Sequence, residues 1–142
     1  MKTLLSNIFL SLVISAFIIG CEQSTSPQTN SEQIYGSWQW TKTEGGIFGT
    51  GGQNNTPQSA GYTAKTVFKP EGIVQFFRND SVINQYKFVI IKDTSHSQTI
   101  NLLHIEGTES FRDQLINFQG SDSLVLSDNS TDAFYHFYVR LK

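Results

Sequence analysis

Alternation between apolar and polar residues, interrupted at short intervals by turn-forming residues, constrains the fold of this chain more than any other feature of its sequence. Eight segments are predicted to be strands because they alternate or are rich in β-branched and aromatic residues. No stretch shows a helical stripe with caps, so we expect little helix beyond a single turn around residues 106–112. The predicted strands cover residues 35–44, 62–69, 73–78, 82–92, 99–105, 111–118, 123–127 and 133–141.

The links between these strands are short and contain residues that suit tight turns. Residues 69–72 (KPEG) place a proline early and a glycine late, and residues 78–81 (RNDS) and 119–122 (QGSD) tolerate positive φ angles. Short links join antiparallel neighbours. Eight such strands close into an up-and-down β-barrel or form a sandwich, since both arrangements dispose of exposed sheet edges. Periodicity alone leaves this choice open.

The alternation also predicts which side chains face the interior. Some strands are apolar on both faces, namely residues 73–77 and 88–91, and there the inward face is undetermined. Elsewhere, two inward sets are predicted: Tyr62, Ala64, Thr66 and Phe68 on one strand, and Tyr135, Phe137, Val139 and Leu141 on the last.

The longest link, residues 45–61, contains six glycines and one pair of large apolar residues, Ile47 and Phe48. Loops of this length in compact domains are usually either functional or disordered. A lid over a binding cavity and a tolerated insertion are both consistent with the sequence. If the loop is a lid, Ile47 and Phe48 are the residues that we expect to fold back over the cavity.

The first twenty residues have the order of a secretory signal peptide, with a charged start followed by a short apolar stretch that serines and an asparagine dilute. A membrane-spanning helix would need roughly 20 continuous apolar residues. Residues 18–21 (IIGC) resemble the lipobox of bacterial lipoprotein signals. That resemblance implies a diacylglyceryl thioether on Cys21. We therefore expect a chain that is lipid-anchored in the cell envelope, with the outer membrane as the expected location and the domain facing the periplasm or the surface.

Cys21 is the only cysteine of the chain, which excludes an intramolecular disulfide and a thiolate metal cluster. The residues after it (EQSTSPQTNSEQ, 22–33) include no large apolar side chain and are predicted to be a flexible spacer. The expected organisation is therefore a signal peptide over residues 1–20, the lipidated cysteine and tether over 21–33, and one domain over 34–142. With 10 basic and 12 acidic residues, the composition does not favour nucleic acid as a partner.

Near the start of the first predicted strand, Gly36-Ser37-Trp38 resembles the Gly-x-Trp signature of lipocalins and related calycin barrels. In that family an arginine from the last strand covers the tryptophan, and Arg140 stands in the matching place. The wider run through residues 68–72 (FKPEG) is similar to lipocalin-like domains of small Gram-negative envelope lipoproteins. The resemblance implies an all-β, eight-stranded antiparallel barrel, with Gly36, Trp38 and Arg140 closing one end. The chain lacks a Thr-Asp-Tyr element and a long C-terminal helix, which distinguishes it from the core lipocalins.

No catalytic or metal-binding motif is present in the sequence. The three histidines His96, His104 and His136 have no metal-ligand spacing, although His104 and His136 could meet if their strands were neighbours. Most acidic residues fall in predicted turns and strand ends, where solvated charges belong. We therefore expect no enzyme activity, no metal and no cofactor.

The leading hypothesis is that the barrel binds a small hydrophobic or amphipathic ligand beneath the loop of residues 45–61. The alternative is a solid barrel that acts through its outer face as a protein or glycan interaction module in the envelope. A filled interior would favour the alternative. The residues expected to contact a ligand are Ile47, Phe48, Tyr86, Phe88, His104 and Tyr138.

Overall fold

A computed structural model of the chain describes residues 31–46, 52–96, 98–108, 111 and 113–142. Strands dominate, and the helical elements are short: η1 (Ser31–Ile34), a 3-10 turn, and α1 (Pro57–Ala60). No helix in the described part of the chain is long and apolar enough to cross a membrane. The strands are β1 (Gly36–Gly45), β2 (Gln53–Asn55), β3 (Ala64–Lys69), β4 (Ile73–Arg78), β5 (Ser81–His96), β6 (Gln98–Ile105), β7 (Gln114–Phe118), β8 (Ser123–Asp128) and β9 (Phe134–Arg140).

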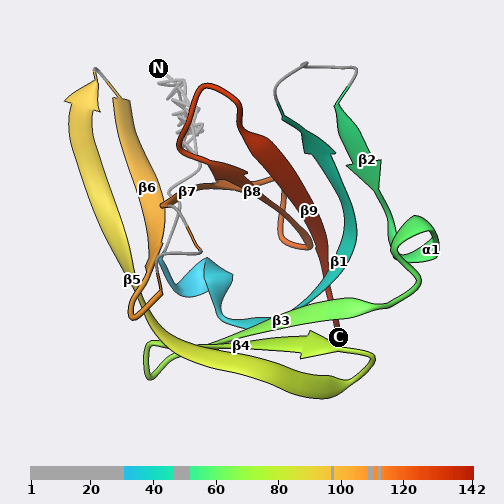
Figure 1. Cartoon of the computed structure of the whole chain (residues 1–142). Helices are drawn as coiled ribbons and strands as arrows, with labels where there is room; N and C mark the ends of the chain where they lie inside the picture. The colour runs from blue at the N-terminus through green and yellow to red at the C-terminus, as the bar shows by residue number, and fades with distance from the viewer. Residues whose placement is uncertain (1–30, 47–51, 97, 109–110, 112) are drawn as a thin grey trace, which may run out of the picture.

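The strands form a closed antiparallel barrel with up-and-down connections (Figure 1). Strands β3 to β9 pair in sequence order, and β1 closes the circle by pairing with β3 on one side and β9 on the other. The predicted eight-stranded antiparallel barrel is therefore confirmed, and each predicted strand lies close to its observed bounds. The sandwich that the alternation also allowed is wrong, because the β1–β9 pairing leaves one continuous sheet.

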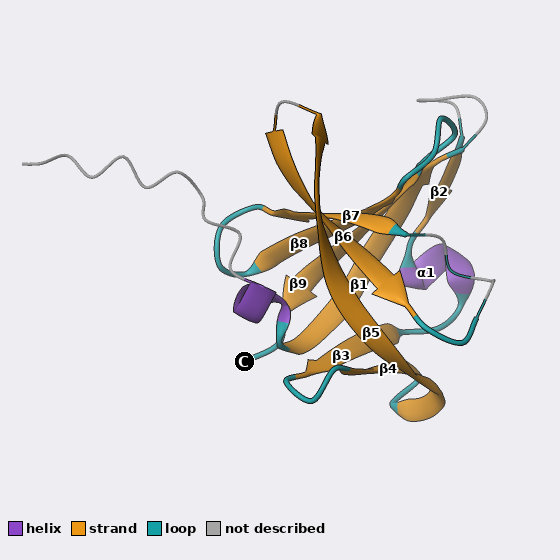
Figure 2. Cartoon of the chain, turned by 90° about the vertical axis from the view of Figure 1, so that its left-hand side faces the viewer, coloured by secondary structure: helices purple, strands orange, loops and turns teal. Residues whose placement is uncertain are grey.

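Turn chemistry explains why consecutive strands pair. Asn79 and Asp80, between β4 and β5, both have positive φ angles, of 49° and 63°, as a tight two-residue hairpin requires. Gly72 has a φ of 74° in the turn between β3 and β4. Both turns were predicted. β5 is long enough to pair with β4 along its first half and with β6 along its second, and it curves across one side of the barrel (Figure 2).

A β-bulge at Thr41 changes which residues of β1 face the interior. The pairing with β9 shifts between Trp40 and Lys42, so the alternation restarts and places Trp40 and Thr43 on the same, inner face. Beyond the bulge, β1 leaves β3 and pairs with the short strand β2. On this side, β1 therefore has β3 as its neighbour at one end of the barrel and β2 at the other.

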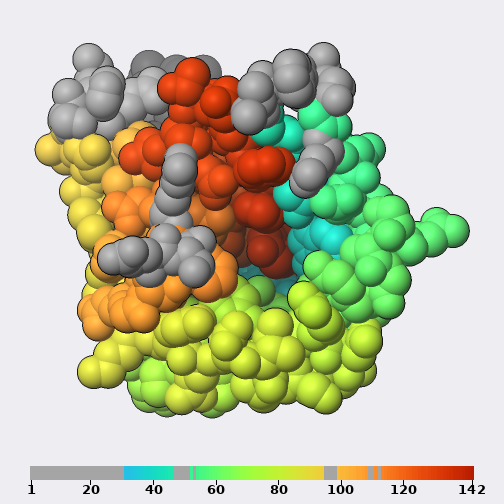
Figure 3. Space-filling view, viewed as in Figure 1, coloured from blue at the N-terminus to red at the C-terminus, as the bar shows by residue number. Residues whose placement is uncertain are grey.

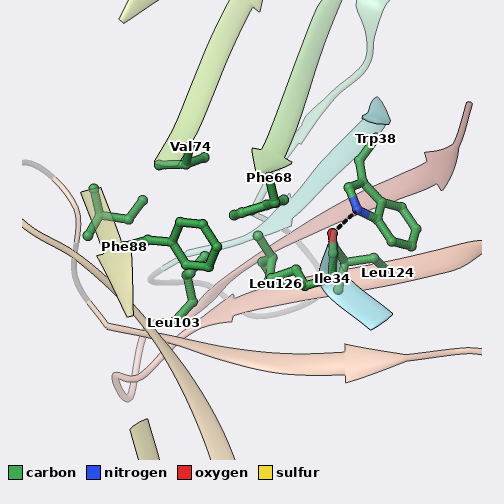
Figure 4. Close-up of a cluster of buried hydrophobic side chains, with 9 residues drawn as sticks. Ile34, Trp38, Phe68, Val74, Phe88, Leu103, Leu124 and Leu126 are labelled. Atoms are coloured by element: carbon green, nitrogen blue, oxygen red, sulfur yellow. Dashed lines mark hydrogen bonds between the residues drawn. The ribbon is translucent and has the colours of Figure 1, made fainter. Parts of the chain in front are cut away.

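One end of the barrel interior is filled by large apolar side chains (Figure 4). Phe68 and Phe88 meet edge to face, with ring centroids 5.2 Å apart. The ring of Trp38, which is fully buried, lies beside this layer, and its indole N–H donates to the Ile34 carbonyl at 2.7 Å. The other buried members of this cluster include Ile34, Val74, Leu103, Ile105, Leu124 and Leu126.

Arg140 closes the barrel end from outside this layer. Its guanidinium lies 4.1 Å from the centre of the Trp38 ring and donates hydrogen bonds to the carbonyls of Tyr35, Gln33 and Ser121. The contact between Trp38 and Arg140 that the lipocalin resemblance implied is present. Because these bonds hold η1 against the last strand, residues 31–33 of the predicted spacer belong to the folded domain. The strands and closing contacts of the described part of the chain lie within residues 31–142, so a fragment that contains these residues keeps all of them.

Gly36 is needed at this closure for two reasons. Its φ of +123° is rarely adopted by L side chains, and a Cβ atom there would lie 2.9 Å from Nη1 of Arg140. We expect Gly36→Ala to lower the free energy of unfolding by about 1 to 3 kcal/mol. The matched control is Gly120→Ala, since Gly120 has a φ of +79° but open space around it, and it should lose about 1 kcal/mol. Equal losses in urea unfolding would show that the approach of Arg140 does not matter.

Two local predictions are wrong. The described part of residues 106–112 has a turn at Glu106 and Gly107 and no helix, whereas helical turns occur at η1 and α1. In β9 the predicted inward set is reversed: Tyr135, Val139 and Leu141 are exposed, and the interior receives Phe134, His136 and Tyr138. The reason is that β9 carries aromatic residues on both faces, so hydrophobicity alone did not identify the inner one.

Candidate ligand cavity

The other end of the barrel is hollow. Two adjoining cavities, of about 310 Å³ and about 650 Å³, share five lining residues from two strands, β4 and β9, and the segment before β7. The shared residues are Phe76, Phe111, Phe134, His136 and Tyr138. Figure 3 shows the face hollowed between the yellow-green atoms of the β4–β5 region and the red atoms of β9.

The smaller cavity borders the packed core, and most of its wall is apolar. Phe68, Leu103, Ile105 and Leu126 separate it from the filled end of the barrel. Phe76 and Phe111 stack in parallel, with ring centroids 5.1 Å apart, and form one aromatic side that both cavities share. An apolar chain in this space would contact aromatic and aliphatic surfaces.

The larger cavity lies beneath the region that joins β2, α1 and β3. Asn55 and Ala60 contribute to its wall, as do Tyr62, Ala64 and Thr66. The predicted inward set of this segment, Tyr62 through Phe68, is therefore confirmed. α1 forms where residues 45–61 were predicted to be a plain loop, because Thr56 caps it with a capping box to Ser59 and Pro57 occupies its first turn.

One wall of the cavities carries a chain of hydrogen-bonding groups. The Trp40 indole N–H donates to Oγ1 of Thr43 at 2.9 Å, and that oxygen lies 2.9 Å from Nδ1 of His136. On the other side of the imidazole, Nε2 lies 3.9 Å from Oδ1 of Asp128. The same carboxylate oxygen accepts a hydrogen bond from Nε2 of Gln114 at 3.1 Å. Four consecutive strands of the barrel thus contribute to one polar wall, namely β7, β8, β9 and β1.

Burial controls the ionisation of two groups on this wall. Desolvation lowers the pKa of His136 below its ordinary value, and the nearby Asp128 carboxylate only partly opposes this effect. Burial raises the pKa of Tyr138 to about 12, although its hydrogen bond with Thr66 acts in the other direction. At neutral pH both side chains are therefore uncharged.

The order of hydroxyl, imidazole and carboxylate resembles a catalytic relay in outline, but its geometry differs in two respects. A separation of 3.9 Å between His136 and Asp128 is too long for the hydrogen bond that orients the imidazole in such relays. The Thr43 oxygen also already accepts the Trp40 indole N–H. The arrangement fits recognition of a polar group better than activation of a nucleophile.

Cationic side chains line the larger cavity at its solvent side. The Arg78 guanidinium lies 4.3 Å from the centre of the Tyr62 ring, and the Lys65 ammonium lies 4.5 Å from that of Phe77. Lys65 also lies 3.5 Å from the exposed carboxylate of Asp80. Both cations are therefore stacked on aromatic rings.

The residues predicted to contact a ligand are distributed unevenly. Tyr138 lines both cavities. Tyr86 does not line either cavity, and its ring packs edge to face against Phe76 and Phe111. Phe88 is buried in the core cluster. Ile47 and Phe48 lie outside the described residues.

His104 is not part of the cavity. Its neighbours Leu103 and Ile105 face the interior, so His104 points outward, where its Nδ1 lies 2.6 Å from the Asp113 carboxylate. β6 and β9 are separated by two strands, so His104 and His136 do not meet. Among the described residues, no group of three or more histidine, cysteine or acidic side chains could hold a metal ion.

The polar wall was missed from the sequence. His136 was expected to be a strand histidine that could meet His104, Asp128 was expected to be a solvated charge, and Thr43 and Gln114 were not predicted as site residues. The β1 bulge brings Thr43 inward, and no residue type in the sequence marks that bulge. One signal was available. The polar residue His136 between aromatic neighbours would have suggested that its face of β9 does not pack into a wholly apolar core.

Comparison of the chain with protein-family models, with curated proteins and with solved structures finds no match in any of the three.

Proposed function

We propose that this protein is a non-catalytic, lipid-anchored envelope protein whose lipocalin-like barrel binds a small hydrophobic or amphipathic ligand. The observation that carries the proposal is the pair of adjoining cavities inside the barrel. Binding sites for small molecules commonly measure about 300 to 1,000 Å³, and both volumes fall in that range. A barrel that served only as a scaffold would have no need of this space.

The lining also suits such a ligand. Aromatic rings dominate the shared region, while the hydrogen-bonding groups are concentrated on one wall. This combination of an apolar surface with a few converging polar groups is typical of sites that hold an amphipathic molecule in one orientation. Burial of an apolar chain in this space would supply affinity of roughly 0.8 kcal/mol per methylene group.

The envelope location rests on the sequence alone. Cys21 and the signal-like segment before it lie outside the described residues, so the lipid anchor is proposed from the lipobox resemblance. A diacylated cysteine followed by a polar tether would hold the barrel close to a membrane surface. A ligand taken from, or delivered to, that membrane would then need to travel only a short distance.

The alternative function, an interaction module with a solid barrel, has less support. Exposed apolar side chains do occur on the outer surface, including Val89 and Ile91 on β5 and Tyr135 and Val139 on β9. β5 and β9 are not neighbours in the barrel, however, so these side chains are divided between separate regions. The cavities also contradict a solid interior.

The test uses Trp40, which lines the larger cavity and stacks on Tyr62. Residues 22–142 would be titrated with n-decylamine, n-decanol and decanoate below their micellar concentrations while tryptophan emission is recorded. The proposal expects a saturable change for at least one probe, and this change should be strongly reduced in Trp40→Phe, because Trp38 lies in the packed end. No saturable change with any of the three would overturn it.

A further inference from the structure

The polar wall of the cavity carries a negative charge, on Asp128, that no positive side chain of the described residues matches. The Asp128 side chain is only 20% exposed, and its neighbour from β7, Gln114, is neutral. Of the described residues, no lysine or arginine lies within salt-bridge distance of this carboxylate. A partly buried carboxylate that lacks a counter-ion is stabilised by any cation that enters beside it.

His136 does not supply that cation at neutral pH. An indole N–H can only donate, so Thr43 Oγ1 accepts from Trp40 and is free to donate its own proton to Nδ1 of His136. With Thr43 as the donor, the imidazole proton resides on Nε2, the nitrogen that faces Asp128 at 3.9 Å. This neutral tautomer agrees with the lowered pKa of His136.

We propose that Asp128, with Gln114 and His136 beside it, selects amphipathic ligands that carry a cationic amine head, which enters the barrel first. The inference rests on the proposed function, because it names the ligand class of the same cavity. The ammonium group would donate to the Asp128 carboxylate, and the apolar chain would lie along the stacked rings of Phe76 and Phe111.

The opposite orientation, with an acidic head at the cationic rim, is less well supported. Lys65 already lies near Asp80, and both Lys65 and Arg78 are stacked on aromatic rings. An acid that entered head first would meet the Asp128 carboxylate and be repelled. Ligands with the same chain but different heads therefore distinguish the two orientations.

The experiment measures dissociation constants of n-decylamine, n-decanol and decanoate for residues 22–142 by calorimetry at pH 7. The amine should bind on the order of tenfold to a hundredfold more tightly than the alcohol, which matches a charge-assisted hydrogen bond. Asp128→Asn should remove this preference by weakening amine binding to about the level of the alcohol. Asp80→Asn, at the exposed rim, is the matched control and should retain it.

A pH series on the unaltered protein gives a check that does not depend on the folding of a variant. The other titratable groups that line the cavities are Asp128 on β8, Tyr138 on β9, Tyr62, and the rim cations Lys65 and Arg78. As the pH falls through the lowered pKa of His136, the imidazolium neutralises Asp128, so amine affinity should fall while alcohol affinity stays constant. His136→Gln should abolish that dependence.

The outcomes separate the two proposals. If decanol or decanoate binds as tightly as the amine, or if Asp128→Asn keeps the amine preference, the inference about the head group is wrong and the binding function stands. If none of the three probes binds, both are wrong.

Discussion

Replacing Trp38 with alanine is expected to lower the free energy of unfolding by about 3 to 5 kcal/mol, as found for large aromatic side chains in cores. The indole is fully buried, packs against Phe118 and lies under the Arg140 guanidinium. Its loss would also leave the Ile34 carbonyl without its donor. Because domains of this size are stable by roughly 5 to 15 kcal/mol, the change would remove a large share of the total.

Urea unfolding followed by circular dichroism provides the measurement for Trp38→Ala. The control is Tyr135→Ala, since Tyr135 is an aromatic residue on the outer face of β9 and is 46% exposed. Tyr135→Ala should change stability by less than about 1 kcal/mol. If the two variants lost the same stability, the closure at Trp38 and Arg140 would not be the structural anchor of this barrel end.

Filling the larger cavity should abolish ligand binding without unfolding the barrel. Ala64 lies on β3 among the lining residues, and Ala64→Trp would place an indole where the ligand chain is proposed to lie. We expect n-decylamine affinity to fall by more than about tenfold, since the loss of a few buried methylene contacts already corresponds to that factor. Overpacking would cost about 1 to 3 kcal/mol of stability, which is small enough for the domain to remain folded.

The matched control for Ala64→Trp is Val139→Trp, which adds an indole on the outer face of β9. Calorimetry should find its affinity unchanged. Circular dichroism would establish that both variants are folded. Unchanged affinity in Ala64→Trp would place the binding site outside the cavity.

The strands could be predicted because turn residues and alternation agree. Asn79 and Asp80 identify a two-residue hairpin, and the strands on either side of it were predicted within a few residues of their observed bounds. The same agreement identified the inner face of β3, where Ala64, Thr66 and Phe68 alternate along the strand and line the cavities.

The polar wall could not be predicted because it depends on two features that alternation does not encode. The bulge at Thr41 reverses the facing of the residues after it, and only the register with β9 reveals the bulge. Aromatic rings lie on both faces of β9, so hydrophobicity did not distinguish the inner face from the outer one. These rings belong to Phe134, Tyr135, Phe137 and Tyr138. Asp128 sits at a strand end, where an acidic residue is ordinarily solvated.

The proposed site therefore combines strands and closing contacts that could be predicted with a hollow, partly polar end that could not. Gly36, Trp38 and Arg140 close the filled end, as the lipocalin resemblance implied. The hollow end is defined by pairings between distant segments, such as Thr43 with His136.

The most direct test of ligand binding inside the barrel is to measure intermolecular nuclear Overhauser effects between n-decylamine and isotope-labelled residues 22–142. If the ligand occupies the cavities, its chain protons should give cross-peaks to the rings of Phe76, Phe111 and Tyr138, which line both cavities. Cross-peaks confined to Val89 and Ile91, on the exposed face of β5, would contradict binding inside the barrel.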